Sequence, residues 1–303
     1  MDCLIVAVLA VVFNNAFADE GGRQWGYKET EFGPADWGLA VPSCSGQFQS
    51  PIDIVTSLSQ SNSSYGGLVP IFDNEDGTVS GVLSNNGHAL TVTLDKTKGG
   101  LTLTAGPLGQ NTFRLEQFRF HFGCESNVGS EHTVDGNSFA SEMHLMFYND
   151  IYGNFKDAVS KPDGLLVIGV FLQEVNGGFN KWMENIALAS TNVVTPNGDS
   201  YSLDGSVPLT QLVPDLMSKS APYYTYKGSL TTPPCYESVQ WILMKNPIPV
   251  TESQLELLRS LSSTSGDSLC NNFRPVKPLN GRKIFKWPGK EKLPGLLNVP
   301  FFH

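Results

Sequence analysis

The chain has 303 residues, a formal charge of −9 and a hydrophobic fraction of 40%. This length is sufficient for one large domain with a substantial core, and because neither a low-complexity linker nor an internal repeat divides the chain, we expect a single domain. The acidic balance, without a Lys/Arg cluster, argues against nucleic acid and anionic membranes as partners.

The N-terminal segment Met1 to Ala18 has the pattern of a secretory signal peptide. It contains an apolar run from Leu4 to Phe13 and ends in the small-x-small sequence Ala16-Phe17-Ala18, although Asp2 stands where a Lys or Arg is usual. The alternative, a membrane anchor, requires about 20 apolar residues, and this run is shorter. We therefore expect a cleaved signal and a secreted, extracellular protein whose formal charge changes from −9 to −8.

Four cysteines follow the predicted signal peptide: Cys44, Cys124, Cys235 and Cys270. In an oxidising compartment four cysteines allow three pairings, and the sequence by itself leaves the pairing open. The sequon Asn62-Ser63-Ser64 lies in a Ser-rich, turn-like segment. We expect Asn62 to be glycosylated on a surface loop.

Most of the remaining pattern is typical of β structure. Leu90 to Leu94 and Leu101 to Ala105 alternate apolar residues with threonine, which predicts strands with two different faces. Gly164 to Gln173 is an almost continuous apolar run suited to a strand buried on both faces, and Tyr236 to Met244 is another strand candidate.

Helical signals are few. The best covers Thr251 to Leu261, where Thr251 and Gln254 form a capping-box pattern and leucines recur at helical spacing. A second, shorter helix is expected from Asn180 to Leu188. Both would lie at the periphery of a mainly β protein.

Two further strand-like segments, Phe113 to Phe122 and Phe139 to Tyr148, carry charged and polar residues between apolar ones. Since successive side chains point to opposite faces of a strand, Arg119 and His121 share one face of the first segment. The phenylalanines between and beside them face the other way and belong to the core. The Arg/His face therefore looks into a polar space.

The same count puts Glu142, His144 and Met146 on one face of the second segment. A single His in a sheet is most often a structural residue with ordinary hydrogen bonds. Here the distribution argues for a site, because three of the five histidines crowd between residues 117 and 149. The five are His88, His121, His132, His144 and His303.

The sequence Gly129 to Gly136, G-S-E-H-T-V-D-G, followed by E-M-H-L, resembles the metal-site region of the alpha-class carbonic anhydrases. The resemblance extends in order over nearly the whole chain after the predicted signal. The matching segments are Trp25 to Tyr27, Gly33-Pro34, Gln49 to Ile54, Asn85 to His88, Gly164 to Phe171, Tyr226 to Pro234 and Asn272 to Pro275.

This resemblance implies the fold and the domain limits. We expect a mainly β (α+β) single domain over residues 19–287, with a large central, mostly antiparallel twisted sheet and short peripheral helices. Residues 288–303 have no counterpart and form a C-terminal tail of unknown role. The resemblance also implies that Cys44 pairs with Cys235, which leaves Cys124 to pair with Cys270.

The family's site holds one zinc on three histidines and leaves a fourth position for water, whose pKa falls to about 7. The resemblance places His121 and His144 at two ligand positions and Arg119 at the first. For the reaction itself, the resemblance assigns Glu131 and Thr231 to orienting the hydroxide, Thr232 to a place beside the substrate and His88 to proton shuttling. It makes Gln117, Asn272 and Glu142 the partners of the first, second and third ligands. It also assigns an apolar wall, which Met146 would narrow, to Leu165, Val167, Leu230 and Met146.

Arg119 disrupts this scheme. A guanidinium stays protonated, has no lone pair for a metal and would place a positive charge beside a dication. We expect zinc not to bind tightly. We also expect Arg119 to compensate the buried charge of Glu131 or Glu142 by pairing with one of these carboxylates and with His121 or His144.

The resemblance with its one replaced ligand leaves three functions open. The first is a secreted carbonic anhydrase-related protein with little or no carbon dioxide hydration, which acts as a binding or scaffold module for a small anion or a secreted protein. The second is an active or weakly active zinc carbonate dehydratase that holds zinc on His121, His144 and solvent. The third is a secreted matrix or storage protein that uses the fold as a stable scaffold.

Overall fold

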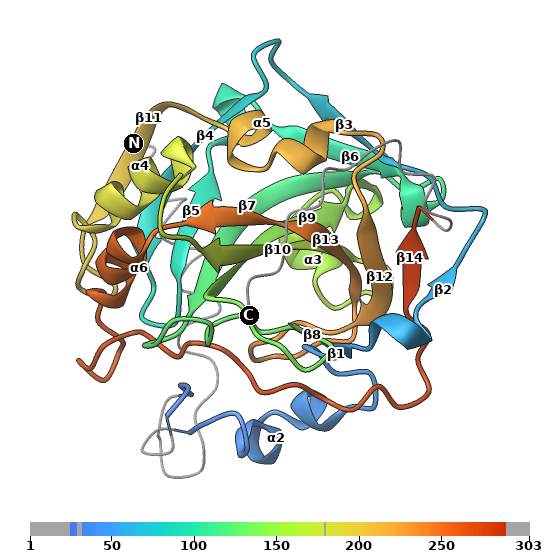
Figure 1. Cartoon of the computed structure of the whole chain (residues 1–303), viewed down its shortest axis with the longest axis horizontal. Helices are drawn as coiled ribbons and strands as arrows, with labels where there is room; N and C mark the ends of the chain where they lie inside the picture. The colour runs from blue at the N-terminus through green and yellow to red at the C-terminus, as the bar shows by residue number, and fades with distance from the viewer. Residues whose placement is uncertain (1–24, 29–31, 179, 289–303) are drawn as a thin grey trace.

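The computed structural model describes residues 25–28, 32–178 and 180–288 (Figure 1). The predicted signal peptide, residues 1–18, lies outside the described residues, as does the predicted tail apart from Pro288. Within the described ranges, no helix combines the length and the apolar composition that a membrane crossing requires.

Strands dominate the structure, as the sequence predicts. The described strands are β1 (Asp53–Ile54), β2 (Gln60–Ser61), β3 (Leu68–Phe72), β4 (Thr78–Asn85), β5 (Leu90–Leu94), β6 (Leu101–Ala105), β7 (Phe113–Phe122), β8 (Thr133–Val134), β9 (Ser141–Asn149), β10 (Leu165–Glu174), β11 (Ser200–Pro208), β12 (Tyr223–Gly228), β13 (Val239–Val250) and β14 (Phe285–Trp287).

These strands form one large sheet and one small one. In the described chain, twelve strands build the large sheet in the order β11-β4-β5-β7-β9-β10-β13-β12-β14-β2, with β6 pairing both β3 and β7, and β1 pairs β8 separately. Most neighbours in the large sheet are antiparallel, while β10–β13 and β14–β2 are parallel. The prediction of a large, mostly antiparallel sheet is confirmed.

Short helices surround this sheet. They are α2 (Trp37–Ala40), α3 (Phe155–Ala158), α4 (Lys181–Ser190), α5 (Leu209–Leu212), α6 (Glu252–Arg259) and the 3-10 turns η1 (Pro42–Ser45), η2 (Thr56–Leu58), η3 (Lys96–Lys98), η4 (Gly106–Leu108), η5 (Asp150–Tyr152) and η6 (Pro214–Met217). The two predicted helices are α4 and α6, which lie side by side (Figure 1). Thr251 and Gln254 form the predicted capping box at the start of α6.

One strand extends well beyond its predicted limits. The segment predicted as Tyr236 to Met244 begins three residues later, because Tyr236 accepts a backbone hydrogen bond from Leu230 across a turn. It then continues to Val250 through a Pro-containing stretch that stays paired with β10 after a register shift. Pro247 and Pro249 in this stretch lack the N–H that a strand interior uses for pairing, which makes a strand here unusual.

The alternation on the two central strands separates two apolar clusters. Phe118, Phe120 and Phe122 point into the larger cluster, together with Leu145 and other side chains from the same face of β9. The smaller cluster lies on the other face and includes Met146, Tyr148, Leu165, Val167 and Trp241. The predicted polar residues lie on this second face.

A bulge in β7 sets this arrangement. The pairing of β7 with β9 shifts between Leu115 and Gln117, so that Glu116 is the extra residue. Leu115 therefore faces the same cluster as Phe118, although the two are an odd number of residues apart. Without the bulge one half of β7 would present its apolar residues to the wrong face.

Both predicted disulfides are formed. Cys44 pairs with Cys235, and Cys124 pairs with Cys270. The first joins η1 to the turn that precedes β13. The second ties the segment just after β7 to the residue that precedes Asn271 and Asn272.

Gly169 on β10 leaves room for a buried carboxylate. It lies opposite His144 in the pairing of β10 with β9. A Cβ at this position would lie 2.5 Å from Leu243 Cδ2 and 2.8 Å from Glu142 Oε1, which are closer than any ordinary contact. Only glycine fits here without displacing one of these groups.

We predict that Gly169→Ala lowers the free energy of unfolding by about 1–3 kcal/mol, because it overpacks the interior next to Glu142. Urea denaturation at neutral pH measures the change. The control is Gly177→Ala, where a Cβ meets nothing within 4 Å, and its effect should stay within about 0.5 kcal/mol. Equal effects of the two substitutions would contradict the packing argument.

Candidate active site

The candidate site occupies the face of β7 and β9 that the alternation predicts. Arg119 lies directly opposite His144 in the antiparallel register, and His121 lies opposite Glu142. The two imidazole rings are 4.5 Å apart between centroids. Adjacent strands therefore bring the cation, both histidines and a carboxylate together.

The Glu142 carboxylate anchors one side of the site. Its Oε1 accepts hydrogen bonds of 2.8 Å from His144 Nε2 and from His132 Nδ1, and its Oε2 accepts one of 2.8 Å from the His132 backbone N–H. Burial acts to raise the pKa of Glu142, but His132 and His144 outweigh it and hold the pKa well below its usual range. Glu142 thus fixes the His144 ring and leaves Nδ1 pointing into the site.

His121 is fixed in the same manner by another partner. Its Nδ1 donates a 2.7 Å hydrogen bond to the backbone carbonyl of Asn272. The Asn272 side chain donates to His88 O and Phe120 O and accepts from the Phe122 N–H. The predicted contact between Asn272 and His121 is therefore present, and it is made by the Asn272 main chain. The other ring nitrogen of His121, Nε2, has no hydrogen-bond partner among the described residues.

Glu131 faces the two histidines. Its Oε2 lies 3.6 Å from His121 Nε2 and 3.8 Å from His144 Nδ1, while its Oε1 accepts a 2.8 Å hydrogen bond from the Arg274 backbone N–H. Burial raises the pKa of Glu131 to about 8, against the opposing effects of the Thr231 hydroxyl and the Arg274 N–H. A proton on this carboxyl relieves the repulsion between its oxygen and the two imidazole lone pairs.

Arg119 does not make the expected ion pair. Among the described residues its one hydrogen bond goes from Nη2 to Thr232 Oγ1, at 3.5 Å, and its Nε is buried without a partner. The expectation that it pairs with Glu131 or Glu142 is wrong. Glu142 accepts from His132 and His144 and Glu131 Oε1 accepts from Arg274, while Glu131 Oε2 is buried without a hydrogen-bond partner among the described residues and makes no ion pair with Arg119. Burial lowers the pKa of Arg119 from its very high ordinary value, and the group remains a cation at neutral pH.

His88 is buried against an aromatic ring. Its imidazole stacks on Trp25, with centroids 3.7 Å apart and planes 11° apart, and its Nε2 has no hydrogen-bond partner in the described chain. Burial and then the charge of Arg119 lower the pKa of His88 to about 4. An imidazole with this pKa is poorly matched to proton shuttling near neutrality.

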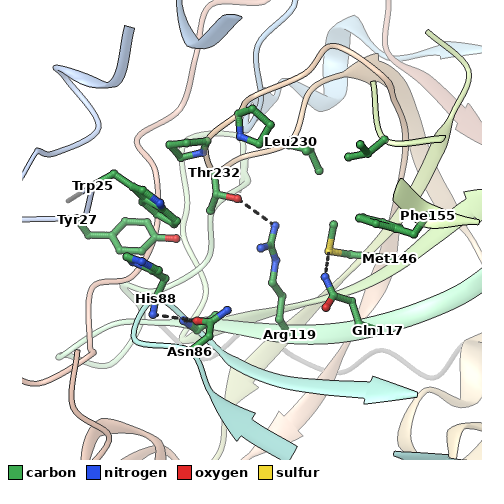
Figure 2. A pocket seen from close by; sticks show the side chains of 14 residues that line it. Trp25, Tyr27, Asn86, His88, Gln117, Arg119, Met146, Phe155, Leu230 and Thr232 are labelled. Carbon is green, nitrogen blue, oxygen red and sulfur yellow. Dashed lines mark hydrogen bonds between the residues drawn. The ribbon is translucent and has the colours of Figure 1, made fainter. Parts of the chain in front are cut away.

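A cavity of about 80 Å³ lies between these groups. Figure 2 shows Arg119 at its centre, with Trp25 and His88 on one side and Leu230 and Met146 on the other.

The apolar wall of this cavity differs from the prediction. Leu230 and Met146 line it as expected, whereas Leu165 and Val167 belong to the same apolar cluster but do not line the cavity. Phe155 and Val159, at α3 and just after it, take their place.

Gln117 does not contact the residue at the first ligand position in any hydrogen bond of the described chain. Its Nε2 donates instead to the sulfur of Met146, at 3.4 Å. The two residues face each other across β7 and β9. The expected partner of the first ligand therefore packs against the cavity wall.

Two residues that sequence reasoning did not assign also build the site. His132 bridges Glu142 and the Tyr226 hydroxyl, which is 2.6 Å from His132 Nε2. The Arg274 guanidinium donates to Gln49 Oε1 and to the carbonyls of Ser50 and Cys44. His132 directly follows Glu131 in the sequence G-S-E-H-T-V-D-G, and Arg274 lies in the sequence N-F-R-P. Their places in these two family motifs were the signal that could have identified them.

Comparison with known proteins decides the family. The family model described as eukaryotic-type carbonic anhydrase matches residues 32–287. The chain belongs to this carbonic anhydrase family. It is 39% identical to carbonic anhydrase 7 of Homo sapiens over 269 residues, which cover 87% of this chain and 97% of that protein. It is 36% identical to carbonic anhydrase 7 of Mus musculus over 271 residues, with the same two coverages.

The donors present differ from the three imidazoles that a carbonic anhydrase zinc site uses. Two imidazole nitrogens face a common point, and His121, Glu131 and His144 offer ligand atoms within 4.8 Å of one another. Arg119, to which the family resemblance assigns the first ligand position, has no lone pair to give. The described residues therefore do not fit a three-histidine zinc.

We predict that His88 makes the protein less stable as the pH falls from 6.5 to 4. The pKa of His88 is about 4 in the folded chain and 6.5 in an unfolded one, so the unfolded state binds more protons in this window and stability rises with pH. Denaturant unfolding at several pH values should show that His88→Gln loses less free energy of unfolding on acidification than the unmodified protein does. The difference between the two losses should reach about 3 kcal/mol at pH 4. A constant difference between the two proteins from pH 7.5 down to pH 4 would contradict the burial of a neutral imidazole.

Proposed function

We propose that this chain is a carbonic anhydrase-fold binding module with little or no carbon dioxide hydration, and that its cavity receives a small anion on Arg119. The observation that carries the proposal is the buried Arg119 guanidinium, which makes one hydrogen bond, 3.5 Å long, among the described residues. The family resemblance assigns this residue to the position of one zinc ligand. A positive charge at this position opposes a bound dication and attracts an anion. Zinc would then bind weakly or not at all.

One observation favours a second candidate, an active or weakly active zinc enzyme. The lone pairs of His121 Nε2 and His144 Nδ1 face each other, and Glu131 lies close to both. Two imidazoles and a carboxylate are a known ligand set for zinc. In this candidate the Arg119 side chain would have to move away from the metal.

A substitution series at Arg119 separates the two candidates. We predict that the purified protein carries far less than one equivalent of zinc and hydrates carbon dioxide negligibly, whereas Arg119→His gains both. Arg119→Gln is the matched control, since it removes the charge without supplying an imidazole, and it should stay inactive. Metal analysis and stopped-flow hydration are the measurements.

The proposal fails if the unmodified protein holds one equivalent of zinc and turns over at a rate near that of Arg119→His. Restoration of zinc and activity by Arg119→His shows that the rest of the site is competent. If Arg119→His binds zinc but remains inactive, the cause of inactivity lies in the cavity, which Met146 narrows.

The module is proposed to be secreted and glycosylated. The signal-like segment 1–18, the two disulfides and a sequon at the partly exposed Asn62 support this. We expect the protein recovered from culture medium to begin at Asp19. The variant Asn62→Gln should be lighter than the unmodified protein by the mass of one glycan. N-terminal sequencing and intact mass measure both, and retention in the cytosol with residues 1–18 attached would contradict secretion.

A further inference from the structure

The cavity has two chemically different sides. Arg119, Thr232 and Gln117 contribute polar groups, whereas Phe155, Val159, Leu230 and Met146 contribute an apolar wall. In Figure 2 the Arg119 guanidinium lies between the Phe155 and Leu230 side and the His88 and Trp25 side. A ligand that touches Arg119 therefore also contacts apolar side chains.

The hydrogen-bonding capacity of Arg119 is largely unused. A guanidinium has five N–H donors, and within the described chain Arg119 makes one hydrogen bond, 3.5 Å long, and its buried Nε makes none. Arg274 provides a contrast in the same molecule, because three oxygens accept from its guanidinium at 2.8–3.0 Å. Both guanidinium groups have a buried Nε without a partner, but protein oxygens accept from both terminal nitrogens of Arg274, whereas Arg119 makes only the long hydrogen bond to Thr232 among the described residues.

Neither nearby carboxylate makes a hydrogen bond to Arg119 in the described chain. Glu142 accepts three hydrogen bonds from His132 and His144. Glu131 accepts from the Arg274 N–H through Oε1, and its Oε2 lies near His121 without a hydrogen-bond partner among the described residues. A carboxylate from outside would supply Arg119 with an acceptor that neither of these groups supplies.

We propose that the cavity binds a short-chain monocarboxylate of about two to four carbons, with its carboxylate on Arg119 and Thr232 and its alkyl end against Phe155, Val159 and Leu230. This inference rests on the proposed function, since it names the class of anion. It goes beyond it by assigning a role to the apolar wall.

Three properties select this class. The planar guanidinium fork matches a carboxylate in a bidentate contact, and the Thr232 hydroxyl adds a donor. Among the described lining residues Arg119 is the single cation, because His88 is neutral at pH 7. One positive charge favours a monovalent anion over a divalent one. The small volume of about 80 Å³ has room for only a few waters, which limits the length of the chain.

The test is calorimetric titration of the purified protein with acetate, propionate, butyrate and hexanoate, and with nitrate and chloride, at constant ionic strength and pH 7.5. Affinity should rise about fourfold per added methylene from acetate to butyrate and fall for hexanoate, which is too long for the cavity. Nitrate is planar and monovalent but has no alkyl group, so it should bind no better than acetate.

Variants assign the two ends of the ligand. Arg119→Gln should weaken butyrate binding at least tenfold, and Arg119→Lys should restore part of it, since Lys keeps the charge but not the fork. Val159→Ala should flatten the chain-length dependence and leave acetate binding unchanged. The matched control is Arg114→Gln, an exposed Arg on the same strand, which should bind as the unmodified protein does.

The outcomes separate this inference from the proposed function. Binding of all the anions with equal affinity and with loss in Arg119→Gln overturns the monocarboxylate class but keeps the anion module. Binding that is unaffected by Arg119→Gln, in protein whose melting temperature shows it is folded, overturns the assignment of Arg119. Absence of any anion binding, together with one equivalent of zinc, overturns the proposed function itself.

Discussion

The buried Glu142 carboxylate is the interaction on which the site depends. It holds His144 on its own strand and His132 on the preceding loop, and His132 in turn accepts from the Tyr226 hydroxyl on β12. Tyr226 shares a 2.8 Å hydrogen bond with Ser50 in the N-terminal part of the chain. One ionised group therefore joins four segments, and removing it would leave buried polar partners without acceptors, which is costly.

This network is complete without the residue at the first ligand position. Neither Glu142 nor its partners contacts Arg119 in a hydrogen bond of the described chain. The scaffold that orients His144 and His121 can therefore persist while the third position changes. The hydrogen bonds that support the two histidines therefore do not depend on a hydrogen bond from Arg119.

Local patterns predicted much of this architecture. Alternation on β7 and β9 correctly placed Arg119, His121 and His144 on one face, because a strand with one face in the core has a strongly specified register. The capping box at Thr251 and the apolar run of β10 were equally local signals. Topology and both disulfide pairings required the family resemblance, since distant segments meet only in the fold.

The rest depended on tertiary packing that no local pattern encodes. The wall residue Phe155 sits on a four-residue helix, whose position is set by what it packs against rather than by its sequence. The direction of Arg119 likewise depended on packing: the histidines bind Glu142 and Arg274 binds Glu131 Oε1, while Arg119 points to Thr232. An argument from charge alone could not rank those partners.

The two disulfides have a consequence for the integrity of the chain. Their loops overlap without nesting, because Cys124 lies inside the segment between Cys44 and Cys235, and Cys270 lies beyond it. A single backbone cut at any point between Cys44 and Cys270 therefore leaves two fragments that are still covalently joined. The molecule can be nicked by a protease at an exposed loop and keep the two halves of its cavity together.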